Sequence, residues 1–192
     1  KALMGKDTKM SWTLGWLGRR LTISRVGSFL QGQGATADDL QIFFSSERQH
    51  LDLTSNLFHQ TPHTKGEVHV RGVLKDRSRS VFQGLIRIEK GAQQSNAYQA
   101  ARAMILNDGA RADQIPGLEI EANDVRCTHA ASTGQIDEEQ VFYLKTRGLT
   151  DNEARKMIVD GFFEPTIERI PLPAVQEHIK NLIDAKWTYA QA

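Results

Sequence analysis

The chain has 192 residues, a length that indicates one domain with at most a small appendage. Its 24 Lys and Arg residues nearly balance its 23 Asp and Glu residues, so no strong field favours nucleic acid or an anionic membrane as partner. No apolar run approaches the roughly 18–20 residues that span a bilayer. The single cysteine, Cys127, excludes an intramolecular disulfide and fits a reducing compartment such as the cytoplasm.

From about Leu14 to Thr133, apolar and polar residues alternate in short runs, which is typical of strands with one inward and one outward face. The runs are Leu21-x-Ile23, Leu40-x-Ile42-x-Phe44, Leu51-x-Leu53, Val68-x-Val70, Leu85-Ile86-x-Ile88, Leu118-x-Ile120 and Val125-x-Cys127. Polar turns separate them at intervals of roughly 11–19 residues, which indicates a sandwich, a barrel or a β-solenoid. Asp108-Gly109 is the one tight hairpin signal, and this scarcity modestly favours a parallel, coiled architecture.

After Gly134 the pattern becomes helical. Asp137 followed by Gln140 resembles a capping box, and Gly148 is placed to end the helix that follows it. Between these signals, the stretch "VFYLKTRGL" has the composition of a short helix. We therefore expect the first helix to begin next to Asp137 and to stop at Gly148.

Thr150 and Glu153 form a clearer capping box for a second helix, which we expect to stop at Gly161. A third helix follows with one apolar face. That face carries Val175, Ile179, Leu182 and Ile183. The sequence therefore predicts a mainly β body over residues 1–134 and a small α-helical domain over residues 135–192, whose core we expect to include Val141, Leu144, Met157 and Ile158.

The stretch Gly32-x-Gly34-x-x-Ala37 has the spacing of a dinucleotide fingerprint, with Asp52 near the position of the ribose-binding acid. The context argues against that function. Two aspartates directly after the motif would face the pyrophosphate, and "LQIFFS" alternates like a strand where a helix must begin. A turn of a solenoid is the better interpretation. The chain also lacks a Gly-Lys-Ser/Thr phosphate loop, so it is not itself a P-loop ATPase.

Two histidines and three acids are weaker candidates for a site. His59-x-x-x-His63 has the spacing of two metal ligands on a helix, but the intervening proline breaks that geometry, so we interpret both as loop histidines. Glu119, Glu121 and Asp124 are similar to the acid clusters of solenoid glycosidases and lyases. Paired carboxylates on a solvated strand face are common, and a catalytic pair is the less favoured interpretation.

Cys127 and His129 are two residues apart, so on a strand their side chains share a face, with α-carbons roughly 6–7 Å apart. That spacing suits two ligands of one metal ion or cluster. Val125 and Ala131 lie on the same face, so an inert thiol beside a hydrogen-bonded histidine is the interpretation that the residues alone favour. A cysteine nucleophile would need a base and an electropositive setting, and Arg126 lies on the opposite face.

The number of ligands limits what this pair can do. Iron–sulfur clusters usually take four protein ligands, mostly thiolates. One thiolate and one imidazole make an incomplete site. If Cys127 and His129 bind a metal or a cluster, another chain must therefore complete the site.

Several stretches in a fixed order carry a resemblance to a known family. They are "GQGA", "QHLD" with His59 following, "KGEVHVRGVLKDRSRSVFQGLIRI", "QAARAMILNDGARADQIPGLEIEANDVRCTHAASTGQIDEEQVFYLKTRGL" and "ARKMIVDGFF". From roughly Leu30 to Pro171 the chain resembles the SufB/SufD family of iron–sulfur cluster assembly proteins, and most of all the C-terminal portion of its SufD branch. The family's SufB branch tends to carry His-Glu-Ala-Thr where this chain has "CTHAAS".

The resemblance implies a right-handed parallel β-helix followed by a C-terminal helical domain. It implies a scaffold rather than an enzyme, which pairs with a SufB-like chain and binds a SufC-like ATPase through its helices, in the cytoplasm or in the plastid stroma of a plant. It places Cys127 and His129 where the two scaffold bodies meet, as ligands of a transient iron–sulfur cluster, with none held stably by the chain alone. Arg147 and Gly148 are expected to belong to the ATPase-docking surface.

Two other functions remain as alternatives. One is a solenoid enzyme that acts on polysaccharide through Glu119, Glu121 or Asp124. The other is a purely structural dimerisation module with an inert Cys127. Whether the isolated chain forms a homodimer is left open by the sequence.

Overall fold

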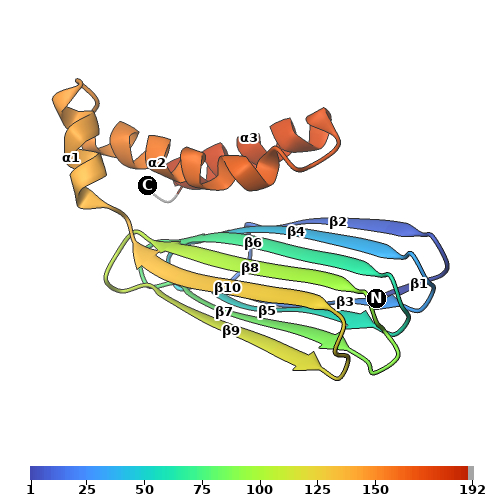
Figure 1. Cartoon of the computed structure of the whole chain (residues 1–192). Helices are drawn as coiled ribbons and strands as arrows, with labels where there is room; N and C mark the ends of the chain where they lie inside the picture. Colours follow the sequence, from blue (N-terminus) through green and yellow to red (C-terminus); the bar gives the residue numbers. More distant parts are fainter. Residues whose placement is uncertain (190–192) are drawn as a thin grey trace.

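The computed structural model describes residues 1–189, and its body is a β-solenoid of about five coils (Figure 1). Each coil gives one strand to each of two parallel five-stranded sheets. One sheet, called sheet A, has the order β1-β3-β5-β7-β9, and the other, sheet B, has the order β10-β8-β6-β4-β2. The strands are β1 Ala2–Met4, β2 Lys9–Trp16, β3 Leu21–Leu30, β4 Thr36–Ser45, β5 His50–His59, β6 Lys65–Leu74, β7 Arg79–Ile88, β8 Asn96–Ile105, β9 Arg111–Ile120 and β10 Arg126–Gln135.

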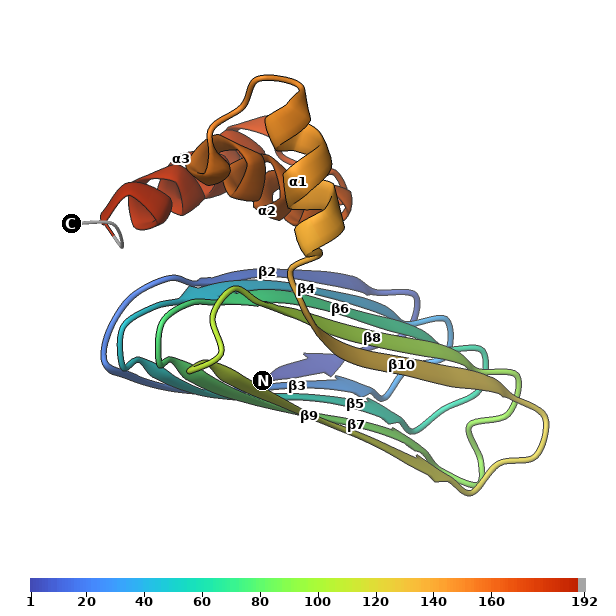
Figure 2. The ribbon, with the colours of Figure 1, turned by 90° about the vertical axis from the view of Figure 1, so that its left-hand side faces the viewer.

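Equivalent residues of successive coils lie in register, which makes the body a stack of rungs about 4.8 Å apart. In sheet B, Thr36 pairs with Lys65, Lys65 with Asn96, and Asn96 with Arg126. All of these ladders are parallel, so the expected mainly β, parallel coiled architecture is confirmed. Figure 2 shows the two sheets facing each other along the body.

The core lies between the two sheets, because alternate residues of every strand point inward. Phe43, Leu53, Phe82 and Ile86 are among its fully buried side chains. Gly72 is needed beside Phe43, since a β-carbon there would collide with the phenyl ring. Polar turns at the strand ends complete each coil, as the sequence pattern predicts.

Three helices follow the solenoid: α1 Glu138–Thr146, α2 Asp151–Ile167 and α3 Pro173–Tyr189. The side chain of Asp137 caps the first helix, and Gly148 takes a φ of 96° behind it. The capping box of Thr150 and Glu153 is present at the start of α2. The expectation that this helix stops at Gly161 is wrong. Gly161 lies inside α2, and the helix continues through Pro165 to Ile167.

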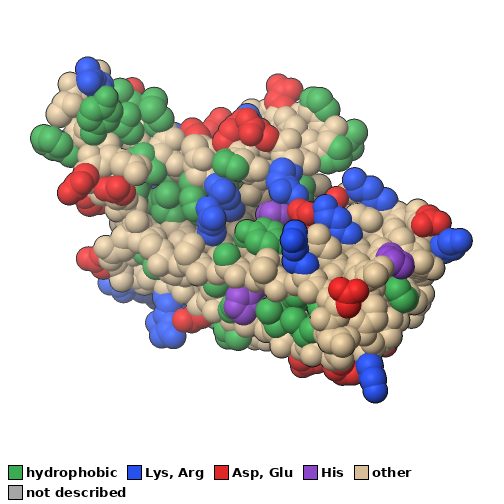
Figure 3. Space-filling view, viewed as in Figure 1, with side chains coloured by type: hydrophobic (Ala, Val, Ile, Leu, Met, Phe, Trp, Pro, Cys, Tyr) green, Lys and Arg blue, Asp and Glu red, His purple; other side chains and the backbone are tan. Residues whose placement is uncertain are grey.

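Helices α2 and α3 cover the outer face of sheet B (Figures 1 and 3). Phe44 and Val73 of the sheet pack with Phe163 of α2 and Trp187 of α3 in one buried cluster. This packing explains why β4 is buried almost throughout, since both of its faces are covered. The helices therefore share their largest core with the β body.

The small cluster under α1 contains Val141, Leu144 and Ile158, as expected. Met157 was also expected there, and that expectation is wrong, because 51% of its surface is exposed. Strand β10 ends at Gln135 and α1 begins at Glu138, and the predicted division after residue 134 stays a prediction. No helix among residues 1–189 is long and apolar enough to cross a membrane.

Candidate functional site

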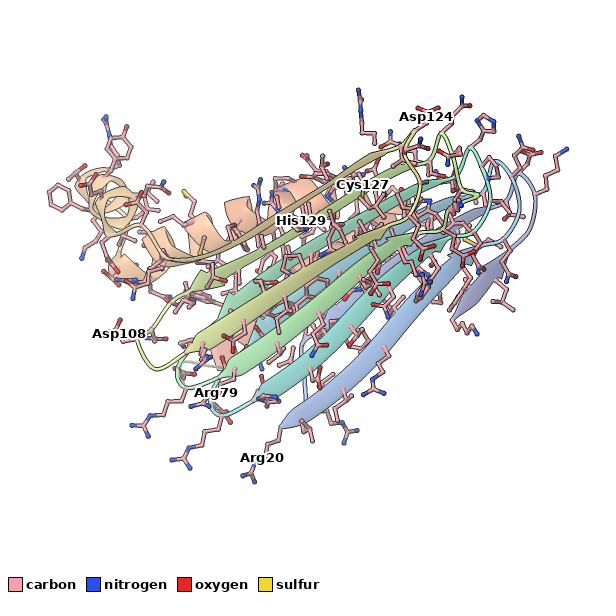
Figure 4. The ribbon with its side chains drawn as sticks, turned by 60° about the horizontal axis from the view of Figure 1, so that its bottom comes forward. Arg20, Arg79, Asp108, Asp124, Cys127 and His129 are labelled. Carbon is pink, nitrogen blue, oxygen red and sulfur yellow. The ribbon has the colours of Figure 1, made fainter. Side chains whose placement is uncertain are left out.

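Cys127 and His129 lie on β10, which is the edge strand of sheet B at the last coil (Figure 4). The strand pairs with β8 on one side only, and on its other side the sheet ends within the described residues. A free parallel edge presents unpaired backbone N–H and C=O groups that can receive a strand from another chain.

Both side chains stand on the inward face of β10, because their rungs continue into the core. Cys127 pairs in register with buried Ala97, and His129 pairs with buried Gln99. Cys127 is half-buried and packs against the core of the solenoid, whereas His129 is exposed. The two potential ligands therefore sit at the open end of the core, where the coil stops.

Burial raises the pKa of the Cys127 thiol above its ordinary value of 9.0. The thiol is therefore protonated near neutral pH and is a weak nucleophile in the chain by itself. Among residues 1–189, no group of three or more His, Cys, Asp and Glu side chains could hold a metal ion. The described chain thus offers two side chains toward a metal or cluster.

A shallow pocket opens between the two terminal strands next to this pair. Its lining includes Ala112 and Gln114 of β9 together with Ala131 and Thr133 of β10. Ala131 follows His129 on the inward face, so the pocket and the two potential ligands belong to one continuous surface. The small side chains of Ala112, Ala131 and Thr133 leave room there for a partner chain to approach closely.

The other candidates from the sequence lie elsewhere. His59 is the last residue of β5 and is fully buried, where it hydrogen-bonds Thr64 at 2.8 Å. Burial lowers its pKa to about 4, so it is a neutral core histidine. The interpretation of both histidines as loop residues is therefore wrong for His59, whereas His63 lies exposed in the turn that follows. Gly34 lies in a turn that leads directly into strand β4, without the helix that a dinucleotide site needs.

The acid cluster is a set of solvated ion pairs. Arg87 lies 3.8 Å from Glu119 and 3.1 Å from Glu121, and all three side chains are about half exposed. Asp124 lies in the turn before β10, at the far end of the strands from Arg79 (Figure 4). The arrangement lacks an enclosed cleft with two opposed carboxylates, which glycoside hydrolysis requires.

Arg147 and Gly148 end the first helix, in the loop before α2. The Arg147 guanidinium lies 5.1 Å from the ring centroid of Tyr143 and donates to its hydroxyl at 3.1 Å. Phe142 is 69% exposed and Tyr143 is 56% exposed. The sequence analysis assigned these aromatic residues no role. Two adjacent aromatic residues in a short helix were the signal that could have indicated an interaction surface.

Comparison with known proteins decides the family. Residues 1–162 match the family model described as "SUF system FeS cluster assembly, SufBD core domain". The chain belongs to the SufBD family. It is 34% identical over 185 residues to the iron–sulfur cluster assembly protein SufD of Bacillus subtilis, and 34% identical over 191 residues to a SufBD family protein of Mycobacterium tuberculosis.

These SufBD relatives are longer than the chain. The matches cover 96% and 95% of this chain, but 42% of the Bacillus protein and 48% of the Mycobacterium protein. The resemblance seen in the sequence is thereby confirmed at the level of the family. The roles of Cys127, His129, Arg147 and Gly148 stay predictions.

Proposed function

We propose that this chain is the SufD-like scaffold part of the machinery that assembles iron–sulfur clusters. The observation that carries the proposal is the position of Cys127 and His129, side by side on the inward face of a free edge strand. Two potential ligands at this open end are half of the four protein ligands that an iron–sulfur cluster usually takes. Family membership supplies the cargo, an iron–sulfur cluster, which is a substrate of the scaffold and not its resident cofactor.

The partner that completes the site is a SufB-like chain docked on β9 and β10. Strand addition to these edges would continue both sheets across the interface and satisfy their free backbone groups. The cluster would then form between the two bodies, with ligands from both, and separation of the bodies would release it. A homodimer through the same edges is the arrangement available to the chain in isolation.

A SufC-like ATPase would dock on the far side of α1. Phe142 and Tyr143 present an apolar surface there, and Arg147 adds a positive charge beside them. Aromatic and arginine side chains are the residue types that dominate binding energy at protein interfaces. The helices connect that surface to sheet B through the buried cluster around Phe163, so movement of the ATPase would be transmitted to the scaffold body.

A scaffold fits the described residues better than either alternative. The thiol of Cys127 has a raised pKa, and the acids at Glu119 and Glu121 are solvated partners of Arg87. Neither group is arranged for covalent or acid–base catalysis on its own. A purely structural module would not require a cysteine and a histidine together at the open end.

Reconstitution of the full-length protein tests the proposal. Iron and sulfide are assayed after anaerobic reconstitution of the protein alone and of the protein with its SufB-like and SufC-like partners. We expect stoichiometric cluster only in the complex, and loss of it with His129→Ala. A stoichiometric cluster in the protein alone would contradict a site shared between two chains.

A further inference from the structure

Gln99 is a polar side chain buried in the core between the two sheets. It is 0% exposed on the inward face of β8, and neither Oε1 nor Nε2 has a hydrogen-bond partner among the residues that the structure describes. A buried amide without partners costs free energy, so packing alone does not explain it. Val68 fills the equivalent position one coil earlier, which shows that an aliphatic side chain fits this rung.

Gly84 on the opposite sheet makes room for this amide. A β-carbon at Gly84 would collide with both Oε1 and Nε2 of Gln99. The Gln99 side chain therefore reaches across the whole interior, from β8 to the backbone of β7. Such an extended amide forms a polar wall between the two sheets, one coil behind the open end.

The open end lies directly above that wall. Gln99 pairs in register with His129, and Gly84 pairs in register with Pro116, so the last coil places an imidazole over the amide. Neighbouring strands are about 4.8 Å apart, which brings the two inward side chains within contact of each other or of one small species between them. Gln114 of β9, also inward, has an amide without a partner among the described residues as well.

We propose that Gln99 is the inner wall of the cluster-assembly site and binds the inorganic species held by His129 and Cys127. Its Nε2–H group donates a hydrogen bond to sulfide, and Oε1 accepts from the imidazole and fixes the ring. Hydrogen bonds to cluster sulfurs and to metal-bound histidines are the interactions that orient and stabilise such centres. The inference rests on the proposed function and adds a binding residue that lies inside the solenoid.

Three variants of the full-length protein in complex with its partners test the inference. Gln99→Leu removes both polar atoms at similar volume, and Gln99→Glu keeps the shape and the acceptor oxygens. Gln41→Leu is the matched control, because Gln41 is a buried inward glutamine of β4 that donates to Asp39 at 2.8 Å. Each variant is compared with wild type in melting temperature and in the rate of cluster formation, followed by visible absorbance.

We expect opposite patterns from the two sites. Gln99→Leu should raise or preserve the melting temperature and slow cluster formation at least tenfold. Gln41→Leu should lower the melting temperature and leave the rate within twofold of wild type. Gln99→Glu should lower the melting temperature, since it buries a carboxylate, yet form clusters faster than Gln99→Leu.

A normal rate of cluster formation by Gln99→Leu would overturn the inference. The inference would also fail if, in all three variants, the rate of cluster formation fell in proportion to the loss in melting temperature. The outcome for His129→Ala separates this failure from a failure of the proposed function. If His129→Ala is impaired and Gln99→Leu is not, the scaffold function holds and the inner wall does not. If neither is impaired, both are wrong.

Discussion

The guanidinium of Arg71 donates a hydrogen bond to the main-chain carbonyl of Phe162 and lies 5.2 Å from the ring centroid of the same residue. This contact joins β6 to the middle of α2. Arg169, near the end of that helix, pairs with Glu67 of β6 at 2.6 Å. Figure 3 shows Lys and Arg side chains gathered along this seam between the helices and the sheet.

Replacement of Arg71 by Met should loosen the helices from the sheet. We expect the free energy of unfolding to fall by about 1–3 kcal/mol, because the variant loses a charged hydrogen bond and a cation–π contact. Urea denaturation measures the loss. Arg102→Met is the control, since Arg102 is the exposed in-register neighbour of Arg71 on β8. An equal loss in both variants would contradict a specific role for Arg71.

Asp39 makes the stability of the solenoid depend on pH. Burial raises the pKa of this carboxyl from 3.8 to about 6, although Ser55 and Gln41 donate hydrogen bonds to it. Between about pH 4 and pH 6 the folded state binds more protons than the unfolded chain does. Stability should therefore fall as pH rises through that window, and should stay reduced above it.

Asp39→Asn should remove that pH dependence. The amide needs no proton to stay neutral, so we expect the variant to be more stable than wild type by about 2–3 kcal/mol at pH 7.5. The difference should vanish near pH 4. Denaturation between pH 4 and pH 8 measures both curves, with Asp52→Asn on the outer face of β5 as the control. Parallel curves for wild type and Asp39→Asn would show that this carboxyl does not set the slope.

The coiled fold could be predicted from the sequence because its signals are local. Alternation of apolar residues, as in Leu51-x-Leu53, needs only a strand with one buried face. The end of α2 could not be predicted in the same way. Gly161 has the usual preference for a helix end, but packing of Phe162 and Phe163 against the sheet keeps the chain helical beyond it.

The candidate site likewise contains residues that could be predicted from local sequence and one that could not. Cys127 and His129 are visible in the sequence because two residue types with metal-binding chemistry stand two positions apart. Gln99 could not be predicted from the sequence, because its proposed role depends on the register between two strands whose paired residues lie thirty positions apart in the chain. The structure shows that the Gln99 amide, which has no hydrogen-bond partner among residues 1–189, lies one coil before His129.

The raised pKa of Cys127 predicts a slow reaction with alkylating agents in the isolated protein. At pH 8 we expect iodoacetamide to modify this thiol more slowly than a cysteine in an unfolded peptide, because less thiolate is present and the side chain is partly buried. Mass spectrometry of the single cysteine gives the rate. Denaturation in urea should restore the rate seen with the peptide. If the folded protein reacts as fast as the peptide, the pKa of the Cys127 thiol is not raised.

The proposal that a SufC-like ATPase docks on α1 can be tested at the surface around Arg147. Arg147→Glu and Tyr143→Ala should each weaken capture of the SufC-like partner by about tenfold or more, the effect of losing a central aromatic or arginine contact. A pull-down with purified partner measures the capture. Arg25→Glu, a charge reversal on the uncovered face of sheet A, should leave it unchanged. Normal capture by both α1 variants would place the docking surface elsewhere.

The open end of the solenoid predicts that Cys127 and His129 can be replaced at little cost in stability. His129 is exposed, so His129→Ala should change the free energy of unfolding by less than about 0.5 kcal/mol. Cys127 touches the core but is only half-buried, so Cys127→Ser should cost less than about 1 kcal/mol, whereas a fully buried hydroxyl without a partner would cost about 1–3 kcal/mol.

Cluster assembly in the complex should nevertheless fall sharply in both variants, because each removes one of the two side chains that we propose as cluster ligands. Thr128→Ala is the matched control, since Thr128 lies between them on β10 and points outward. It should leave both stability and assembly unchanged. A large loss of stability with normal assembly in Cys127→Ser would instead identify the thiol as core filling, and the pairing of a cysteine with a histidine at this edge would then have no part in building a cluster.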